Sequence, residues 1–348
     1  MIFALYYNRK MNVRSIIADL NRYTEDELFY KRCYELRSDK KALKKYIASF
    51  DPQYLEERRL ILPNVSWYSK LAEEFLFRGH CEQNVYLTKH YRYTPVFEHC
   101  HDYFETFFVL SGQCENVIGG ERFILPAGSL CFIAPQVNHS LGVFSDCVVI
   151  NIFIRKTTFD DIFFPLLKTN DILSDFFMGN IYAVKPIEYI IFNMGDDKEM
   201  TGKVFDLLSE QYRNDKYSSR IMEYLISIFF TFLIRKHENK PIIQRTDNDK
   251  HMQRYIAYIN ENFRTVTLAQ VARHFSISTA HCSRLIKAQT GKHFTDLVRD
   301  IRLRHAQSLL KSSNMKIYDI SYSLGYENQE TFIRSFKNAF GVTPGQYR

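Results

Sequence analysis

The pattern of hydrophobic and polar positions changes several times along the 348 residues. Residues 1–82 are highly charged and carry helix signals, with Thr24 and Glu27 at the spacing of a capping box and a helix-favouring run over 40–47. Over 83–157 the pattern becomes a series of short β-branched and aromatic runs separated by glycine and proline: VYLTKHY, FETFFVL, ERFIL, SLCFIA and CVVINIFI. The sequence therefore predicts a helical N-terminal extension followed by an antiparallel β-sandwich or small barrel.

Helical spacing returns after residue 157. Apolar positions three and four apart, such as Val204, Leu207 and Leu208, predict helices within 158–240, which either close the core of the barrel or form a dimer interface. The stretch 241–250 is polar and lacks periodicity, so we expect a linker there. The predicted fold class is thus α+β, ending in an all-α domain at 251–348.

Residues 251–348 contain one helical pattern twice. In the first copy, a helix that starts after Thr267 and a turn at 276–278 precede a second helix that Gly291 ends. The second copy has the same order and ends its second helix at Gly341, with an offset of 49 residues before the turn and 50 after it. Each copy is predicted to be a helix-turn-helix unit. A connecting helix over 294–310 would place the two units in successive major-groove segments, roughly 34 Å apart.

The net charge of +7 is concentrated in this repeat. Residues 250–348 hold 15 Lys and Arg against 6 Asp and Glu, a net charge of +9, whereas the first 249 residues hold 31 against 33, a net charge of −2. A domain that faces the phosphates of nucleic acid requires such an excess, although a solvated basic face would show the same count.

The sequence shows neither a targeting signal nor a cysteine motif. The first residues lack a cleavage site, and the longest apolar run, 224–234, is about half of the roughly 20 residues that cross a bilayer. The seven cysteines are scattered without a CxxC pair, which favours reduced thiols over a disulfide framework or a zinc finger. We therefore expect a cytoplasmic protein.

The second copy of the repeat resembles the signature of AraC-type transcription regulators. The segment IYDISYSLGYENQETFIRSFKNAFGVTPGQYR, 317–348, has the family's residues in register, and TLAQVARHFSISTAHCSRLIKAQTGKHFTDLVRDIRLRHAQSLL, 267–310, is similar to the preceding half of the same domain. Two positions depart from the family pattern, because Ile286 replaces a usual Phe and Ser321 replaces a usual Ala.

The resemblance implies which residues meet DNA. In the first unit the small side chain of Ala280 predicts fewer contacts with base edges than in some relatives. Arg can bind guanine, Gln adenine and Glu cytosine through their base edges, whereas lysines position the protein on phosphates. The implied DNA-binding residues are Ala280, Ser283, Arg284, Lys287, Gln329, Glu330, Arg334 and Lys337.

The segment EHCHDYFETFFVLSG, 98–112, places His99, His101 and Glu105 at positions of equal parity, which point to one face if the segment is a single strand. Together with the later glycines, Pro126 and His139, it resembles the two motifs of the cupin barrel, so that His139 would reach the same pocket from another strand. Three imidazoles and a carboxylate can bind Zn, Fe, Mn or Ni.

The resemblance to AraC-type regulators favours a different role for this set. It implies that the cupin-like domain is a sensor, whose polar wall binds a sugar-type or other small organic effector or forms a structural hydrogen-bond network. The second motif also departs from the enzymes' form, because Ser129 follows Pro-x-Gly and no Asn follows His139 at the expected spacing. No cofactor is expected, and a metal bound by the four residues is the alternative.

The sequence as a whole predicts a bacterial transcription factor that is not an enzyme. It would bind double-stranded promoter DNA as a homodimer, respond to a small-molecule effector, and contact RNA polymerase if it activates transcription. A metal-dependent cupin oxygenase or isomerase with a DNA-binding tail is the rival hypothesis. An architectural DNA binder with a vestigial sensor is the third.

Overall fold

The computed structural model of the chain divides into two compact units. The first contains 1–158 and 188–243, and the second contains 159–187 and 244–348. The described residues are 12–58, 60–62, 70–71, 73, 77, 83–155, 158, 172–182, 187–237, 241–243 and 247–348. The mixed helix and sheet content confirms the predicted α+β fold class.

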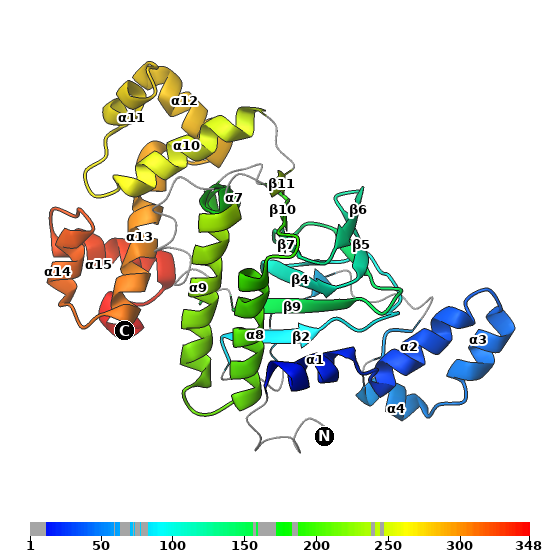
Figure 1. Ribbon diagram of the computed structural model, residues 1–348. Coiled ribbons are helices and arrows are strands. Elements are labelled where there is room, and N and C mark those ends of the chain that lie inside the picture. The colour runs from blue at the N-terminus through cyan, green and yellow to red at the C-terminus, as the bar shows by residue number, and fades with distance from the viewer. Residues whose placement is uncertain are drawn as a thin grey trace. The chain divides into compact units, whose positions relative to one another are not determined.

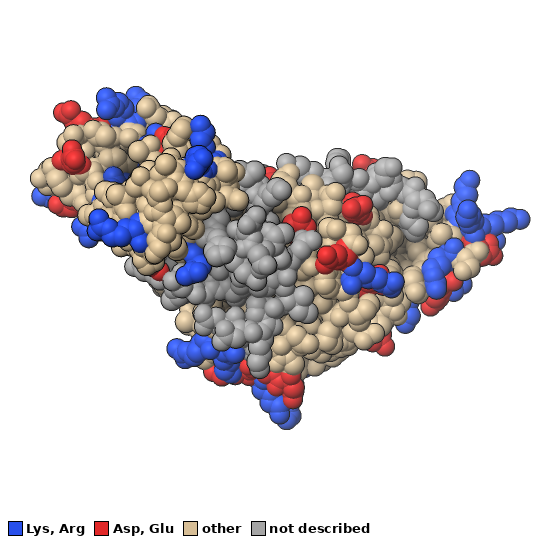
Figure 2. All heavy atoms as spheres, turned by 90° about the horizontal axis from the view of Figure 1, so that it is seen from above, with Lys and Arg blue, Asp and Glu red and all other residues tan. Residues whose placement is uncertain are grey.

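The N-terminal extension is helical over 13–57, as predicted, whereas Lys70–Leu71 of the predicted helical range is a short strand. It consists of α1 (Val13–Asn21), α2 (Glu25–Glu35), α3 (Lys40–Ile47) and α4 (Pro52–Glu57). The predicted capping box is present, since the Thr24 hydroxyl accepts from the Glu27 backbone N–H and the Glu27 carboxylate accepts from that of Thr24. These helices bury a small core of their own, made of Phe29, Tyr30, Cys33, Leu43 and Leu60. The lysines of α3 are exposed, and Figure 2 shows basic side chains gathered at this end of the first unit.

A buried ion pair attaches the extension to the sheet domain. The Arg92 Nε donates to Glu27 Oε1 at 2.9 Å, and the Lys89 Nζ lies 2.7 Å from Glu27 Oε2. The Arg92 side chain is 1% exposed and that of Glu27 is fully buried. Arg92 also donates to the carbonyl of Arg22 at the end of α1, so one guanidinium binds two helices of the extension.

Two antiparallel sheets form the centre of the first unit. The six-stranded sheet has the order β11-β10-β7-β4-β9-β2, and the three-stranded sheet has the order β6-β5-β8. A short parallel pair, β1 (Lys70–Leu71) and β3 (Cys100–His101), forms a third, separate sheet. The other strands are β2 (Val85–Lys89), β4 (Glu105–Ser111), β5 (Gln113–Ile118), β6 (Glu121–Pro126), β7 (Ser129–Ile133), β8 (His139–Gly142), β9 (Val148–Ile154), β10 (Tyr189–Asn193) and β11 (Pro241–Ile243).

The two faces of the six-stranded sheet differ in polarity. One face is apolar and packs on α8 (Lys198–Arg213) and α9 (Ser218–His237), which run side by side (Figure 1). For example, the rings of Phe132 and Phe230 lie 5.6 Å apart. The opposite face carries Glu105 and turns toward the three-stranded sheet, because His139 on β8 hydrogen-bonds Glu105. The buried core of this unit thus forms two layers, one between sheet and helices and one between the sheets.

Two expectations for the middle of the chain need correction. The region 158–240, predicted to be helical, contains β10, whose run YIIF is buried beside β7. Pro186 and Gly195 flank this run, but periodicity alone does not distinguish a short apolar run from a buried helix segment. The predicted linker 241–250 contains β11, which pairs with β10, and α10 starts at Asp247. The division between the two units nevertheless falls after Ile243.

The second unit contains the predicted repeat. In the first copy, α11 (Leu268–His274) and α12 (Thr279–Thr290) follow the Thr267 capping box, and in the second copy α14 (Ile317–Ser323) and α15 (Gln329–Phe340) repeat this order. The two second helices have 12 residues each, and both end at a left-handed glycine, Gly291 or Gly341. The connecting helix α13 (Phe294–Ser312) confirms the expected one. Additional helices are α7 (Ile172–Tyr182), which packs on α10 (Asp247–Glu261), and α16 (Pro344–Tyr347).

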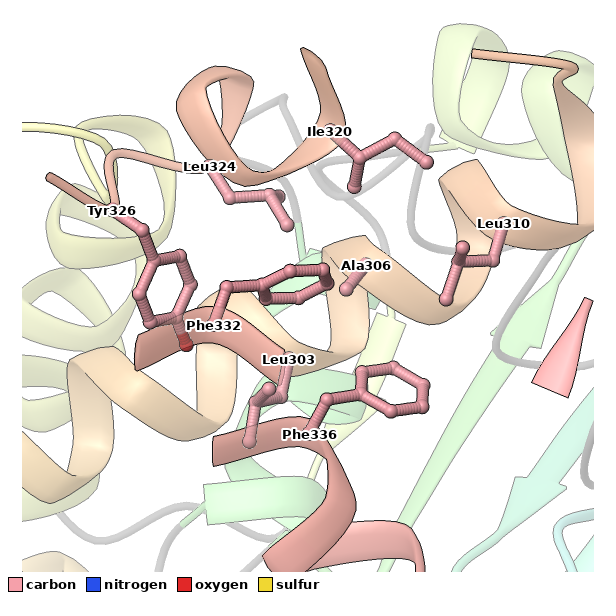
Figure 3. Close-up of a cluster of buried hydrophobic side chains, with 8 residues drawn as sticks. All are labelled: Leu303, Ala306, Leu310, Ile320, Leu324, Tyr326, Phe332 and Phe336. Atoms are coloured by element: carbon pink, nitrogen blue, oxygen red, sulfur yellow. The ribbon is translucent and has the colours of Figure 1, made fainter. Parts of the chain in front are cut away.

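The second helix-turn-helix unit is built on an apolar core that three helices share. Figure 3 shows side chains from α13, α14 and α15 pointing toward one another. Burying such side chains stabilises the unit by about 1.5–3 kcal/mol each. The core consists of Leu303, Ala306, Leu310, Ile320, Leu324, Tyr326, Phe332 and Phe336.

The six described cysteines are free thiols, and five of them are buried; Cys81 lies outside the described residues. Within the described ranges, no helix is long and apolar enough to span a bilayer.

Candidate functional sites

The helix α12 presents one polar and one apolar face. Of the four residues predicted to bind DNA here, Ala280, Arg284 and Lys287 are exposed, and Ser283 is half-buried. The opposite face buries Ile286, which fills the place of the family's Phe in the core. The Ser278 hydroxyl caps the first turn and leaves the exposed positions in regular helical register.

The helix α15 has the same arrangement. Glu330, Arg334 and Lys337 are exposed, and Gln329 is half-buried at the first helical position. The buried face consists of Phe332 and Phe336. The structure therefore presents equivalent surfaces at equivalent positions of the two copies, as a protein that reads two successive segments of one duplex requires.

The cations on these two faces are available to a polyanion. Among the described residues, neither Arg284 nor Arg334 forms an ion pair with an acidic side chain. The connecting helix α13 differs, because Arg299 lies 3.0 Å from Asp296. The faces that the sequence assigns to DNA thus carry positive charge that no acidic side chain among the described residues compensates.

The predicted polar set in the barrel converges on one carboxylate oxygen. The Nε2 atoms of His101 and His139 each lie 2.9 Å from Glu105 Oε2. His101 is fully buried, His139 is 2% exposed and Glu105 is 8% exposed, whereas His99 is half-buried. The His99 and His139 rings lie 4.4 Å apart. The structure therefore brings all four predicted residues together.

The local reason for this convergence differs from the predicted one. His101 ends β3, and Glu105 begins β4, which belongs to another sheet, so the segment is not a single strand. A bend at 102–104 joins the two strands, and the His101 Nδ1 bonds the Tyr103 carbonyl oxygen across it at 2.7 Å. The expectation of one strand with equal parity was therefore wrong, although the side chains meet.

All three imidazoles are held in the same way. Each Nδ1 lies within hydrogen-bond distance of a backbone carbonyl, at 3.2 Å for His99, 2.7 Å for His101 and 3.0 Å for His139. The Nε2 atoms of His101 and His139 are thereby turned toward Glu105. Ligand atoms of His99, Glu105 and His139 lie within 4.8 Å of one another, and a backbone carbonyl on Nδ1 is the usual support of a metal-binding histidine. The donor set thus fits a divalent metal ion such as zinc or iron.

Electrostatics favours the ionised carboxylate. Burial would raise the pKa of Glu105, but hydrogen bonds from His101 and His139 outweigh burial and hold that pKa well below its ordinary value. Burial lowers the pKa of His139, yet the hydrogen bond to Glu105 raises it overall. For His99, burial and the nearby His139 lower the pKa to about 4, so this imidazole is neutral at pH 7.

His101 and His139 each face two hydrogen-bond acceptors, a carbonyl and the carboxylate. A neutral imidazole has a single N–H, so it cannot donate to both. A neutral imidazole therefore leaves one of its two acceptors without a donor. Chemically, the set can form a hydrogen-bond network or hold a cation.

Comparison with known families follows the same division of the chain. Residues 84–161 match the family described as "AraC-like ligand binding domain", and residues 271–348 match the family described as "Helix-turn-helix domain". The first range contains the His–Glu set, and the second contains α12 and α15. The chain thus joins an AraC-like ligand-binding domain to a helix-turn-helix domain, and its similarity is to AraC-type transcriptional regulators.

The chain is also similar to individual proteins. The chain is 23% identical over 252 residues to the HTH-type transcriptional activator RhaS of Klebsiella pneumoniae. The matched residues cover 72% of this chain and 87% of the relative. It is 40% identical over 78 residues to the HTH-type transcriptional regulator GlxA of Rhizobium meliloti, 22% of this chain and 24% of that protein. Among solved structures, ToxT from Vibrio cholerae is 16% identical, with a TM-score of 0.33, over 76% of this chain and 95% of that one.

The interior between the two sheets contains polar groups that sequence patterns did not indicate. Asn116 is fully buried, and neither atom of its amide has a hydrogen-bond partner among the described residues. The same is true of Ser129 Oγ, Asn151 Oδ1 and His90 Nε2. Burial lowers the pKa of His90 to about 4, so it too is neutral at pH 7.

Strand register places these groups between the two sheets. Asn151 pairs with Phe107, which lies on the same face of β4 as Glu105. On β7, Ile133 pairs with Glu105, and Ser129 lies four residues before Ile133 and therefore on the same face. Asn116 shares its face of β5 with Ile118, which pairs with His139. A lone Asn within the apolar run VVINIFI was the available sequence signal, because an amide seldom occurs in a strand buried on both faces.

Proposed function

We propose that this AraC-type regulator binds promoter DNA through α12 and α15, and that a small molecule inside the barrel controls this binding. The observation that carries the proposal is the set of orphaned polar atoms between the sheets, at Asn116, Ser129, Asn151 and His90. An unsatisfied buried polar group costs about 1–3 kcal/mol, so a ligand that bonds several of them gains affinity. A ligand shifts DNA binding only if it binds two states of the protein unequally.

The interior favours an uncharged, polyhydroxylated effector such as a sugar or polyol. The orphaned groups are amides, a hydroxyl and a neutral imidazole, which donate to and accept from hydroxyl groups. The same face carries the aromatic side chains of Phe107 and Phe153, on which the apolar face of a sugar ring could pack. A carboxylate-bearing ligand would meet the ionised Glu105 and is disfavoured.

The DNA-binding part of the proposal is tested by selecting duplexes from a random pool with the full-length chain. The expected result is an enriched sequence that contains two short elements. Arg334→Ala should lower affinity by about 1–3 kcal/mol and relax the preference in one element, because a bidentate base contact is lost. The control is Arg299→Ala, which removes an exposed, ion-paired arginine of the same unit. Enrichment that is absent, or unchanged by Arg334→Ala, would contradict the proposal.

The effector part is tested with two asparagine variants of the full chain. Sugars, polyols and sugar acids are screened for an increase in Tm, and the uncharged compounds are expected to stabilise. Asn116→Leu should abolish that increase while leaving the ligand-free protein equally or more stable, since it removes an orphaned amide. Asn180→Leu is the matched control, because the Asn180 amide donates to two carbonyls and its loss should destabilise the protein. A compound that stabilises Asn116→Leu as strongly as wild type would show that it binds elsewhere.

A metal ion is the second candidate ligand. The supporting observation is that backbone carbonyls hold all three Nδ1 atoms, which turns the Nε2 atoms of His101 and His139 toward the Glu105 carboxylate, where a cation would be bound. A bound metal would act as a Lewis acid for a ligand's oxygen. Elemental analysis of purified protein tests this candidate. Stoichiometric metal that is lost in His139→Gln supports it, and metal-free protein that still binds DNA and effector excludes it together with the rival enzyme hypothesis.

We also propose that the regulator acts as a homodimer in the cytoplasm, where bacterial promoters are found. The exposed apolar face of α9 supports the dimer, since Tyr224 is 57% and Ile228 is 42% exposed. Contact with RNA polymerase would follow if the protein activates transcription.

A further inference from the structure

The two helix-turn-helix units contact each other through the loop between α10 and α11, which lies outside α12 and α15. Arg302, on the connecting helix α13, donates from Nε to the Phe263 carbonyl and from Nη2 to the Arg264 carbonyl, both at 2.9 Å. Both carbonyls lie in the loop between α10 and α11. The Arg302 guanidinium also lies 5.6 Å from the ring centre of Tyr326, which belongs to the core of the second unit. One side chain therefore contacts parts of both units.

The backbone of the second turn touches the same loop. Gly325 has a φ of +80°, and a Cβ at this position would lie 2.0 Å from the Arg264 carbonyl oxygen. The equivalent residue of the first turn is Ser276, which also has a positive φ, 55°, but carries a side chain. Positive φ alone therefore does not require glycine here. The close approach of the second turn to Arg264 does.

A third contact extends the same junction. Phe263 packs against the core of the second unit and stacks on His305 of α13, with ring centres 4.1 Å apart. The junction thus combines a guanidinium with two carbonyl acceptors, a backbone contact that excludes a Cβ, and an aromatic stack. Such contacts fix the orientation of one helix-turn-helix unit relative to the other. Arg302 directs these donors at protein carbonyls rather than at solvent.

We propose that Arg302 and Gly325 are positioning residues that fix the spacing between α12 and α15, so that the protein selects DNA sites by the distance between their two elements. The proposal rests on base reading by both helices, as proposed above. One inserted base pair moves an element by about 3.4 Å and rotates it by roughly 35°, which a rigid pair of units cannot follow. A flexible pair could follow it at small cost.

The experiment uses the full-length chain and the site that it selects from random duplexes. Affinity is measured for that site, for sites with one base pair inserted or deleted between the elements, and for a site with one element scrambled. Wild type should lose at least about 10-fold in affinity on either spacing change. Gly325→Ala and Arg302→Met should reduce that loss to about 3-fold or less, while they bind the single-element site as wild type does.

Gly341→Ala is the matched control. Gly341 has a φ of +77°, so alanine there incurs the same backbone strain, but its added Cβ would have no neighbour within 4 Å. This variant should keep the full spacing penalty. A junction variant that unfolds will also lose its binding to the single-element site. In that case the spacing penalty of the other junction variant tests the proposal. Equal affinity of wild type for all spacings, or an unchanged penalty in both junction variants, would overturn the spacing proposal while DNA reading stands. A wild-type protein that selects no sequence would overturn both.

Discussion

At the scale of single residues, Ser321 is the clearest departure from an optimal core. It is fully buried on α14, and its hydroxyl has no hydrogen-bond partner among the described residues. Ser321→Ala should raise the free energy of unfolding by about 1–2 kcal/mol, because it removes an orphaned buried hydroxyl without opening a cavity. Urea unfolding of the two proteins measures the difference.

The control for this prediction is a serine of the same helix whose hydroxyl is satisfied. The Ser323 Oγ donates to the Ile320 carbonyl at 2.8 Å. Ser323→Ala should therefore give no increase in stability. If Ser321→Ala destabilises the protein as much as Ser323→Ala does, the hydroxyl of Ser321 has a partner, and the prediction fails.

Residue patterns in the sequence located part of the barrel site. Histidine and glutamate are conspicuous in an apolar segment, so the sequence alone indicated His99, His101, Glu105 and His139. It did not indicate Asn116, because an asparagine at an alternating position of a short strand is equally consistent with an exposed face. Its burial depends on the second sheet, which the strand's own sequence does not encode.

At the scale of elements, the attachment of α2 depends on one buried charge pair. Arg92→Met would leave the Glu27 carboxylate fully buried, with Lys89 as its remaining cation. The expected loss is about 3 kcal/mol of the free energy of unfolding, the lower end of the cost of breaking a buried pair, since Lys89 still offsets part of the buried charge. Arg92→Met combined with Glu27→Met should recover most of it. Chemical unfolding measures both, and limited proteolysis tests whether the extension detaches first.

An exposed ion pair of the same helix is the control. The Arg32 and Glu35 side chains are 53% and 47% exposed. Arg32→Met should change the free energy of unfolding by less than about 1 kcal/mol. A similar small effect of Arg92→Met would mean that the extension is held by its apolar contacts instead.

Helices and strands were predicted well where their sequence signals lie within the element itself. The repeat in the second unit was predicted to within two residues, because caps, left-handed glycines and helical spacing all lie inside each element. β10 was missed, because YIIF fits either a strand or a buried helix and its pairing with β7 is made with residues more than 50 positions away. The break between β3 and β4 was missed for the same reason, since the strand partners decide it.

At the scale of the whole molecule, the exposed face of α9 is the feature that a monomer leaves unexplained. Tyr224 and Ile228 of this helix are 57% and 42% exposed, and Tyr217, directly before its first residue, is 60% exposed. Residues at this spacing lie on one side of the helix. A second copy of α9 packed antiparallel, with 224 opposite 228, would also bring 217 opposite 235, so that each Arg235 faces a Tyr217 ring of the other copy.

This arrangement predicts that a charged substitution in the stripe dissociates the dimer. Tyr224→Glu together with Ile228→Glu should raise the Kd of the dimer at least about 30-fold, because two carboxylates per copy would be desolvated in the interface. Sedimentation velocity over a range of protein concentrations measures the Kd. Tyr318→Glu is the control, because Tyr318 is 54% exposed on α14, outside the stripe, and its change should leave the Kd unaltered. A wild-type protein that stays monomeric at tens of micromolar, or a double variant that still dimerises, would show that α9 does not form the interface.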